Sequence, residues 1–141
     1  MQNTNIQAKS EILNQKSEAN PKSEALNQKH YDLEERTLVF SRNIINHIKT
    51  LPKTMGNIEI GKQLIRSAGS VGANYIEANE ALSKKDFIMR IKISKKEAKE
   101  SLYWLKLIEP LSSNEAGRQK LIQEATELMN ILGAIYRKAI T

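Results

Sequence analysis

The chain has 141 residues, of which 40% are hydrophobic and 27% charged, with a formal net charge of +6. This length allows one domain with at most a tail, and no apolar run approaches the roughly 18 residues that a membrane span requires. The absence of cysteine excludes disulfides, thiolate nucleophiles and Cys-ligated metal sites. Because the first thirty residues are polar and lack the apolar stretch of a signal peptide, we expect a cytoplasmic protein.

Residues 1–30 contain a short internal repeat. KSEILNQK at 9–16 recurs as KSEALNQK at 22–29 with one substitution. Each copy has only one or two large apolar side chains, too few to offset the entropy lost on ordering the backbone. We therefore expect residues 1–30 to be a polar, mostly disordered leader, with a short helical arm that folds on a partner as the alternative. Its four lysines and three glutamates give only +1, so it is not a basic nucleic-acid-binding arm.

From residue 31 to the C-terminus, helix patterns follow one another with almost no strand pattern between them. Asp32 and Glu35 have the spacing of a capping box, and Pro52 ends the first helix after Leu51. Its apolar positions are Phe40, Ile44, Ile48 and Leu51. The second helix is predicted over about 57–79, with core positions Ile60, Leu64, Ala68, Val71, Tyr75 and Ala78.

The middle of the second helix contains two glycines, Gly69 and Gly72. A glycine inside a helix costs up to about 1 kcal/mol relative to alanine, so a compensating contact is expected. One interpretation is a bend or a close approach of a neighbouring helix. The other is a shallow groove where a polymer backbone could approach.

Two further helices complete the pattern. Ser83 and Asp86 predict the start of the third helix, and Pro110 its end. Its inner positions are Phe87, Ile91, Ala98, Leu102 and Leu105. Ser112 and Glu115 predict a capping box for the fourth helix, whose apolar positions are Leu121, Ala125, Leu128, Leu132, Ile135 and Ala139.

Short connections at about 52–56, 80–83 and 110–112 make sequential helices antiparallel neighbours. The sequence therefore predicts an all-α fold over residues 31–141, an antiparallel up-down-up-down four-helix bundle. A chain segment of this size can bury a core of its own.

The third helix carries most of the net charge of the chain. Residues 84–106 contain eight basic and three acidic side chains, which is +5 of the total +6. At roughly 100° per residue, five of the lysines fall in a stripe about 80° wide. A stripe of this kind predicts a polyanion as partner. The candidate nucleic-acid-binding residues are Lys85, Lys92, Lys95, Lys96, Lys99 and Lys106, with Arg66 on the second helix.

The lysine stripe also has a simpler interpretation, because exposed helix faces are commonly charged for solubility. A solubilising face would interleave glutamate with lysine, however, whereas Lys92–Lys96 and Lys95–Lys99 are like-charge pairs four residues apart that weaken a helix slightly. Their presence favours binding.

The second and third helices carry more apolar residues than one core requires. They could widen the core face, or they could form a subunit interface, since a monomer would expose a contiguous apolar patch. We favour a homo-oligomer. The candidate interface residues are Met89, Ile93, Trp104 and Leu107 on the third helix and Ile58, Ile65 and Ile76 on the second.

A row of polar side chains follows the second helix, within about 80° of one another. Its members are Gln63, Arg66, Ser70, Asn74 and Glu77. The row could be a hydrogen-bonded network that fixes helix register or a subunit contact, with Arg90, Glu97 and Glu100 as partners. Alternatively, Arg66 could hold a phosphate while Asn74 contacts a base. We favour the structural interpretation.

The stretch GKQLIRSAGSVGANYIEANEALSKKDFIMRIKISKKEAKESLYWLKLI at 61–108 resembles the four helix bundle protein family, also called 23S rRNA intervening-sequence proteins. The resemblance extends from YDLEERT at 31–37 to the C-terminus. It implies a compact antiparallel bundle, assembly into a ring-shaped pentamer, and association with RNA, since related bundle proteins serve retroelements as basic nucleic-acid-binding accessories. It brings no set of catalytic residues.

An enzyme is the least favoured class. Arg42 and His47 have the spacing of the R-x4-6-H ribonuclease motif of HEPN domains, in which such a pair could act on a phosphodiester. That motif lies on a late helix, however, whereas this pair lies on the first. With two histidines and no E-x-x-H pair, we expect no metal and no cofactor.

The sequence thus favours a non-enzymatic, oligomeric nucleic-acid-binding bundle, accessory or chaperone-like, with RNA as the preferred partner. The alternative is a structural module that binds another protein. The ribonuclease remains a minor third hypothesis.

Overall fold

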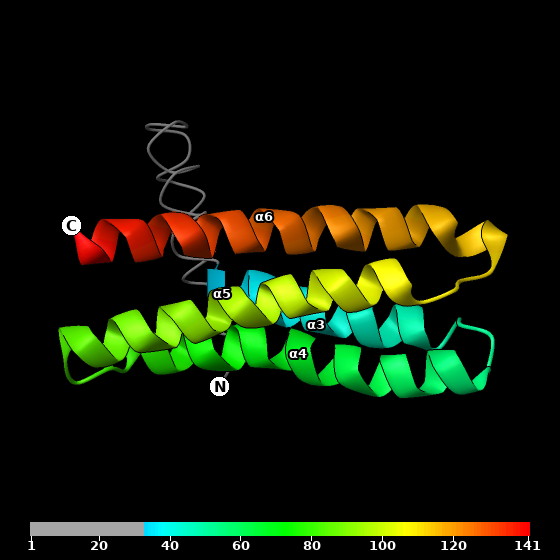
Figure 1. The fold of residues 1–141 in the computed structure, drawn as a ribbon, viewed down its shortest axis with the longest axis horizontal. Coiled ribbons are helices and arrows are strands. Elements are labelled where there is room, and N and C mark those ends of the chain that lie inside the picture. Colours follow the sequence, from blue (N-terminus) through cyan, green and yellow to red (C-terminus); the bar gives the residue numbers. More distant parts are fainter. Residues whose placement is uncertain (1–32) are drawn as a thin grey trace, which may run out of the picture. The chain divides into compact units, whose positions relative to one another are not determined.

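The computed structural model describes residues 33–141, which form four α-helices and one 3-10 turn and contain no strand. The elements are α3 (Leu33–Ile48), α4 (Met55–Asn79), α5 (Lys84–Leu107), η1 (Ser112–Asn114) and α6 (Glu115–Ile140). The helices run side by side in one bundle (Figure 1). The predicted all-α four-helix fold is therefore confirmed. The predicted leader, residues 1–30, and the cap residue Asp32 lie outside the described residues.

Each helix is antiparallel to the one that follows it. Asn79 at the end of α4 donates a 2.9 Å hydrogen bond to Glu34 at the start of α3, whereas Gly61 near the start of α4 lies against Ile48 at the end of α3. Arg118 at the start of α6 similarly donates to the carbonyl of Ile108 just after α5, at 2.9 Å. The chain thus follows the predicted up-down-up-down path.

The first and last helices are also neighbours, which closes the bundle. Arg36 on α3 donates two hydrogen bonds to Glu124 on α6, at 2.6 and 3.0 Å. His47 on α3 lies beside Gly117 on α6. Each helix therefore packs against two others around a shared core.

The core consists mainly of the apolar positions that the helical spacing predicts. The largest fully buried apolar side chains are Phe40, Ile44, Leu64, Ile91, Leu105, Ile108, Leu128 and Leu132. Six of the predicted apolar positions are only partly buried, namely Ile48, Ile60, Phe87, Leu102, Ile135 and Ala139.

Serines occupy core positions on the α4–α5 contact that the apolar pattern leaves out. Ser67, Ser94 and Ser101 are fully buried. The hydroxyls of Ser67 and Ser101 are 2.8 Å apart, and the Ser94 hydroxyl donates to the carbonyl of Val71 at 2.6 Å. Satisfied in this way, small polar side chains let α4 and α5 approach closely without leaving an unpaired buried group.

The helix starts differ in part from the predictions. Ser83 caps α5 as expected, accepting from the backbone N–H of Asp86 at 3.1 Å. The capping box predicted at Ser112 is wrong, because residues 112–114 form η1 and α6 begins at Glu115 without a side-chain cap bond. The Glu115 carboxylate accepts from Arg118 at 2.7 Å.

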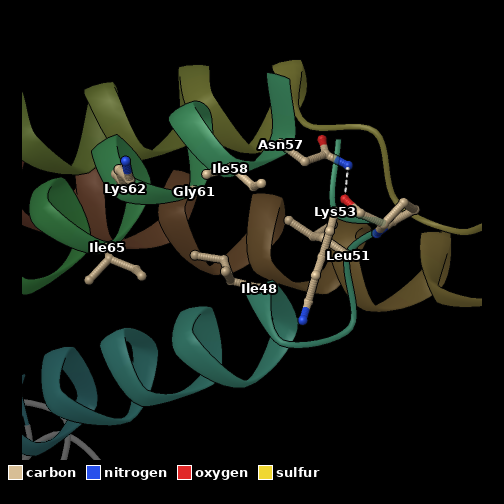
Figure 2. A pocket seen from close by; sticks show the side chains of 9 residues that line it. Ile48, Leu51, Lys53, Asn57, Ile58, Gly61, Lys62 and Ile65 are labelled. Carbon is tan, nitrogen blue, oxygen red and sulfur yellow. Dashed lines mark hydrogen bonds between the residues drawn. The ribbon is translucent and has the colours of Figure 1, made fainter. Parts of the chain in front are cut away.

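One buried amide connects two loops at the same end of the bundle. Asn57 is 4% exposed, and its side-chain N–H group donates to the carbonyls of Pro52 and Glu109 at 3.0 and 2.9 Å. Its side-chain oxygen accepts from the backbone N–H of Glu109 at 3.0 Å. Figure 2 shows Asn57 beside an apolar groove of about 250 Å³ into which Ile48 and Ile58 project.

The two glycines of α4 lie in different surroundings. A Cβ atom at Gly72 would lie 2.7 Å from the Thr37 hydroxyl oxygen and 3.1 Å from its Cβ, and Thr37 is fully buried. A Cβ atom at Gly69 would meet only the Ser41 hydroxyl oxygen, at 3.8 Å. The close-approach interpretation is thus confirmed for Gly72, whereas Gly69 has room for a side chain.

We therefore expect opposite effects from alanine at these two positions. Gly72→Ala should destabilise the protein by about 1–3 kcal/mol, because the added methyl group overpacks the contact with Thr37. Gly69→Ala should stabilise it by up to about 1 kcal/mol, because alanine is the better helix former and meets no obstacle. Denaturant unfolding of the two variants measures both effects, and equal changes of stability would contradict the assigned α3–α4 contact.

Candidate nucleic-acid interface

The predicted lysine residues lie on the solvent side of α5. Lys85, Lys92, Lys96, Lys99 and Lys106 are exposed, and Lys95 is half-buried. The described residues 33–141 place no carboxylate within 4.0 Å of any of these six ammonium groups. The positive charge of this face is therefore not neutralised within the described part of the chain.

Arg66, the seventh predicted binding residue, is in a different situation. Its guanidinium group donates to Glu100 and lies 3.5 Å from Glu97, both on α5. The bond to Glu100 is the main cause that raises the pKa of Arg66 above its usual value. Arg66 connects α4 to α5, and its charge is balanced by two carboxylates.

Glu97 is the more buried of the two carboxylates, with its side chain 19% exposed. Burial, followed by the neighbouring Glu100, raises the pKa of Glu97, and the charge of Arg66 opposes this. Two carboxylates around one guanidinium group thus form a compact network at the α4–α5 contact.

The rest of the polar row supports the structural interpretation. Arg90 on α5 donates to the side-chain oxygen of Asn74 at 3.2 Å, and the amide of Asn74 donates to the Ser70 carbonyl at 2.9 Å. Gln63 and Glu77 are exposed and make no such bond to a described residue. The inner members of the row therefore fix the register of α4 against α5.

An open hollow of about 730 Å³ lies next to this network on the outside of α5. Its lining consists of three basic, two acidic and two aromatic side chains, namely Arg66, Lys96, Lys99, Glu97, Glu100, Tyr103 and Trp104. The two aromatic rings are in edge-to-face contact with centroids 5.0 Å apart. Lysines and aromatic rings thus lie side by side, the combination that binds single-stranded nucleic acid in other proteins.

The predicted interface residues all lie at or near the surface of the chain. Ile58, Ile65 and Ile76 on α4 are 47%, 41% and 45% exposed. On α5, Met89 and Leu107 are each 46% exposed, and Ile93 and Trp104 are half-buried. One chain does not bury these residues in its core.

Sequence reasoning missed three exposed apolar residues on α3, namely Leu38, Val39 and Ile45. Leu38 and Ile45 are 54% and 39% exposed and lie seven residues apart, so they share one face of the helix. That face is the one that carries Ser41 and Ile48 toward α4. The seven-residue spacing could have revealed a second apolar stripe, but the core pattern of α3 was stronger.

The family model for the 23S rRNA-intervening sequence protein matches residues 29–134. The chain belongs to this family. A solved structure with 34% sequence identity is described as a protein of unknown function from the S23 ribosomal protein family of Bacteroides thetaiotaomicron VPI-5482. The match covers 73% of this chain and 96% of that chain, with a TM-score of 0.63. No curated protein matches the chain.

The membership of the 23S rRNA-intervening sequence protein family agrees with the bundle fold described above. Within residues 33–141, no group of three or more His, Asp or Glu side chains could hold a metal ion. No helix of this region is both long enough and apolar enough to cross a membrane.

The candidate ribonuclease pair is divided between surface and interior. Arg42 is exposed, whereas His47 is only 8% exposed and packs against Gly117. The Nε2 atom of His47 is buried and has no hydrogen-bond partner among the described residues. Burial and, secondarily, the positive charge of Arg118 lower the pKa of His47 below 6.5, and Glu115 opposes the shift.

We expect His47 to make the stability of the bundle pH-dependent. Because its pKa is lowered on folding, the unfolded chain binds a proton more readily, and stability falls as the pH drops below about 6.5. The slope is at most about 1.4 kcal/mol per pH unit for one proton. Urea unfolding between pH 7.5 and 5 should show this loss in the wild type and in His30→Gln, and a flatter profile in His47→Gln. An unchanged profile in His47→Gln would contradict the assignment.

Proposed function

We propose that the protein is a non-enzymatic, oligomeric RNA-binding bundle that acts as an accessory or chaperone-like factor in the cytoplasm. One observation carries the proposal. The lysine face of α5 has no carboxylate within 4.0 Å among the described residues. A polyanion would supply the missing counter-charges.

The distribution of acidic residues supports a binding role over a solubilising one. Glu124 and Glu127 bind Arg36 on the α3–α6 side. Glu97 and Glu100, the only glutamates of α5, bind Arg66 on the α4 side. These acids stabilise contacts between helices and leave the lysine face unneutralised.

RNA is preferred to DNA because of the family. Its model is named for the intervening sequence of 23S rRNA, and the solved relative is assigned to a ribosomal protein family. Contacts from lysine position a phosphate backbone and do not select bases. We therefore propose binding that depends on charge and shape more than on sequence.

The burial of His47 speaks against the ribonuclease hypothesis. A general base must come within hydrogen-bond reach of the proton that it abstracts, and the imidazole is enclosed between α3 and the start of α6. Arg42 is on the surface, so it does not share one site with the buried imidazole. The geometry therefore supports a binding protein.

Two patches of apolar side chains support an assembly of several copies, one of exposed residues on α3 and α4 and one of exposed and half-buried residues on α5. The α3–α4 patch contains Leu38, Ile45, Ile58, Ile65 and Ile76. The α5 patch contains Met89, Ile93, Trp104 and Leu107. Around the axis of α4, Ile65 lies about 100° from Arg66, the residue whose side chain reaches α5. The isoleucines of α4 therefore face away from α5, and the two patches face different directions.

Two different patches favour a head-to-tail contact between copies. In a two-fold dimer each copy uses the same surface, whereas a contact between unlike surfaces generates a ring when its rotation closes. We propose that the α3–α4 patch of one copy covers the α5 patch of the next. A ring-shaped pentamer, as in the family that the sequence resembles, would repeat the lysine face five times and raise the avidity for RNA.

Binding of RNA should be electrostatic and should depend on α5. In the variant Lys92→Gln/Lys96→Gln/Lys99→Gln, we expect the slope of log affinity against log salt to fall by about 2, since each phosphate contact with a single strand contributes about 0.7. Fluorescence anisotropy with a labelled single-stranded RNA of mixed sequence at several salt concentrations measures this slope.

The matched control removes the same charge from other exposed lysines, in Lys49→Gln/Lys53→Gln/Lys138→Gln. It should retain most of the wild-type affinity and slope. Salt-independent binding, or equal loss in both triple variants, would contradict an RNA-binding face on α5 and would favour the protein-interaction hypothesis.

The assembly should depend on both apolar patches. Trp104→Glu and Ile65→Glu should each shift the light-scattering mass toward the 16.0 kDa monomer, because a charge in a buried interface is costly. Leu82→Glu, at a fully exposed loop position, is the control and should leave the mass unchanged.

Mixing the two monomeric variants tests the head-to-tail arrangement. Each variant keeps the patch that the other has lost, so the mixture should form a dimer through the one remaining intact contact. A wild-type mass of 16.0 kDa would contradict the oligomer, and a mixture that stays monomeric would contradict the pairing of the two patches.

A further inference from the structure

Two cationic side chains meet over a glycine where α5 packs against α6. A Cβ atom at Gly133 would lie 3.3 Å from a guanidinium nitrogen of Arg137 and 3.7 Å from the Nζ atom of Lys95. The two nitrogens are therefore no more than about 7 Å apart, the sum of these distances. Gly133 lies near the C-terminal end of α6 and is buried. It is buried because these two side chains lie close over it.

The convergence has no counter-charge among residues 33–141. No carboxylate in this region lies within 4.0 Å of Lys95 or Arg137. Two like charges at this distance repel each other, so their proximity is unfavourable in the free protein. An anion placed between them would convert that repulsion into attraction.

A third cation lies one helical turn away. The Nζ atom of Lys92 is 5.8 Å from the ring centroid of Tyr136, within the range of a cation–π contact. Lys92 precedes Lys95 by three residues, and Tyr136 follows Gly133 by three, so both pairs are neighbours on their helices. The α5–α6 contact therefore presents a short row of three cations with one aromatic ring.

The acidic residues of α6 point elsewhere. Glu124 and Glu127 bind Arg36 of α3, and Glu115 binds Arg118 within its own first turn. Beyond the first turn of α6, the side that faces α5 thus carries only basic and uncharged side chains.

From this arrangement we propose that Lys95 and Arg137 form a phosphate-binding seat over Gly133, with Lys92 holding the adjacent phosphate of the same strand. The missing side chain at Gly133 leaves room for both cations to converge. A phosphate between them accepts a charge-assisted hydrogen bond of about 2.7–2.9 Å from each. This inference rests on the proposed RNA-binding function and gives α6 a direct part in it.

The test compares two double variants with the same net charge. Lys95→Gln/Arg137→Gln removes the seat, and Lys49→Gln/Lys138→Gln removes two exposed charges elsewhere. Lys138 follows Arg137 on α6 but lies about 100° around the helix. Affinity for a labelled single-stranded RNA of mixed sequence is measured against salt, and the light-scattering mass is checked for each protein. The seat variant should lose about 1.4 from the salt slope, 0.7 for each of two contacts, and the control clearly less.

A third variant tests the convergence itself without changing charge. In Gly133→Ala the new methyl group occupies the space toward which both cations lean, and their flexible ends must move apart. We expect several-fold weaker RNA binding with an equal or higher melting temperature, because alanine favours the helix. If Gly133 served only the packing of α5 against α6, the melting temperature would fall and the affinity of the folded protein would not change.

The outcomes separate this inference from the proposed function. A wild type that does not bind RNA would overturn the proposed function, and the seat with it. A wild type that binds, with equal losses in the two double variants, would overturn the seat alone and leave the binding on the outer face of α5. Unchanged affinity in Gly133→Ala would overturn the shared seat in favour of independent lysine contacts.

Discussion

The close approach of α4 to both of its neighbours is the constraint on which the rest of the bundle depends. On one side Gly72 gives room to Thr37 of α3, and on the other Ser67 meets Ser101 of α5 across a 2.8 Å contact. Larger side chains at these positions would separate the helices. Because cores are close-packed, the small residues of α4 set how far apart its neighbours stand, and therefore where their outer faces point.

This packing separates the arginines, which pair with acids between helices, from the lysines of α5. Arginines reach across helix contacts and bind the acids, as Arg36 does with Glu124 and Arg66 does with Glu100. A planar guanidinium group suits such paired contacts, whereas lysine is a flexible, strongly hydrated point charge. The lysines of α5 stay at the surface as a result. The contacts between helices and the external charge of α5 thus rely on different side chains.

Most of the fold could be predicted from the sequence, because apolar spacing of three and four residues identifies buried helix faces such as Leu64 and Leu128 directly. The exposure of the α5 lysines followed from the same spacing. Contacts between helices could not be predicted in this way. Whether Arg66 faces a phosphate or a glutamate depends on which helix lies beside it, and the wheel of a single helix does not contain that information. The same holds for Lys95 and Arg137, 42 positions apart in the sequence and brought together only by the antiparallel pairing of α5 and α6.

The amide of Asn57 makes the two ends of the bundle unequal. At its end, three partly buried hydrogen bonds join the connection after α3 to the segment after α5. At the opposite end, the connection at 80–83 carries a fully exposed Leu82, and the bond from Asn79 to Glu34 is open to water. Local unfolding begins where buried contacts are few. The helices should therefore unfold locally from the end opposite Asn57. Backbone amides near residue 80 should exchange with solvent long before those near residue 57.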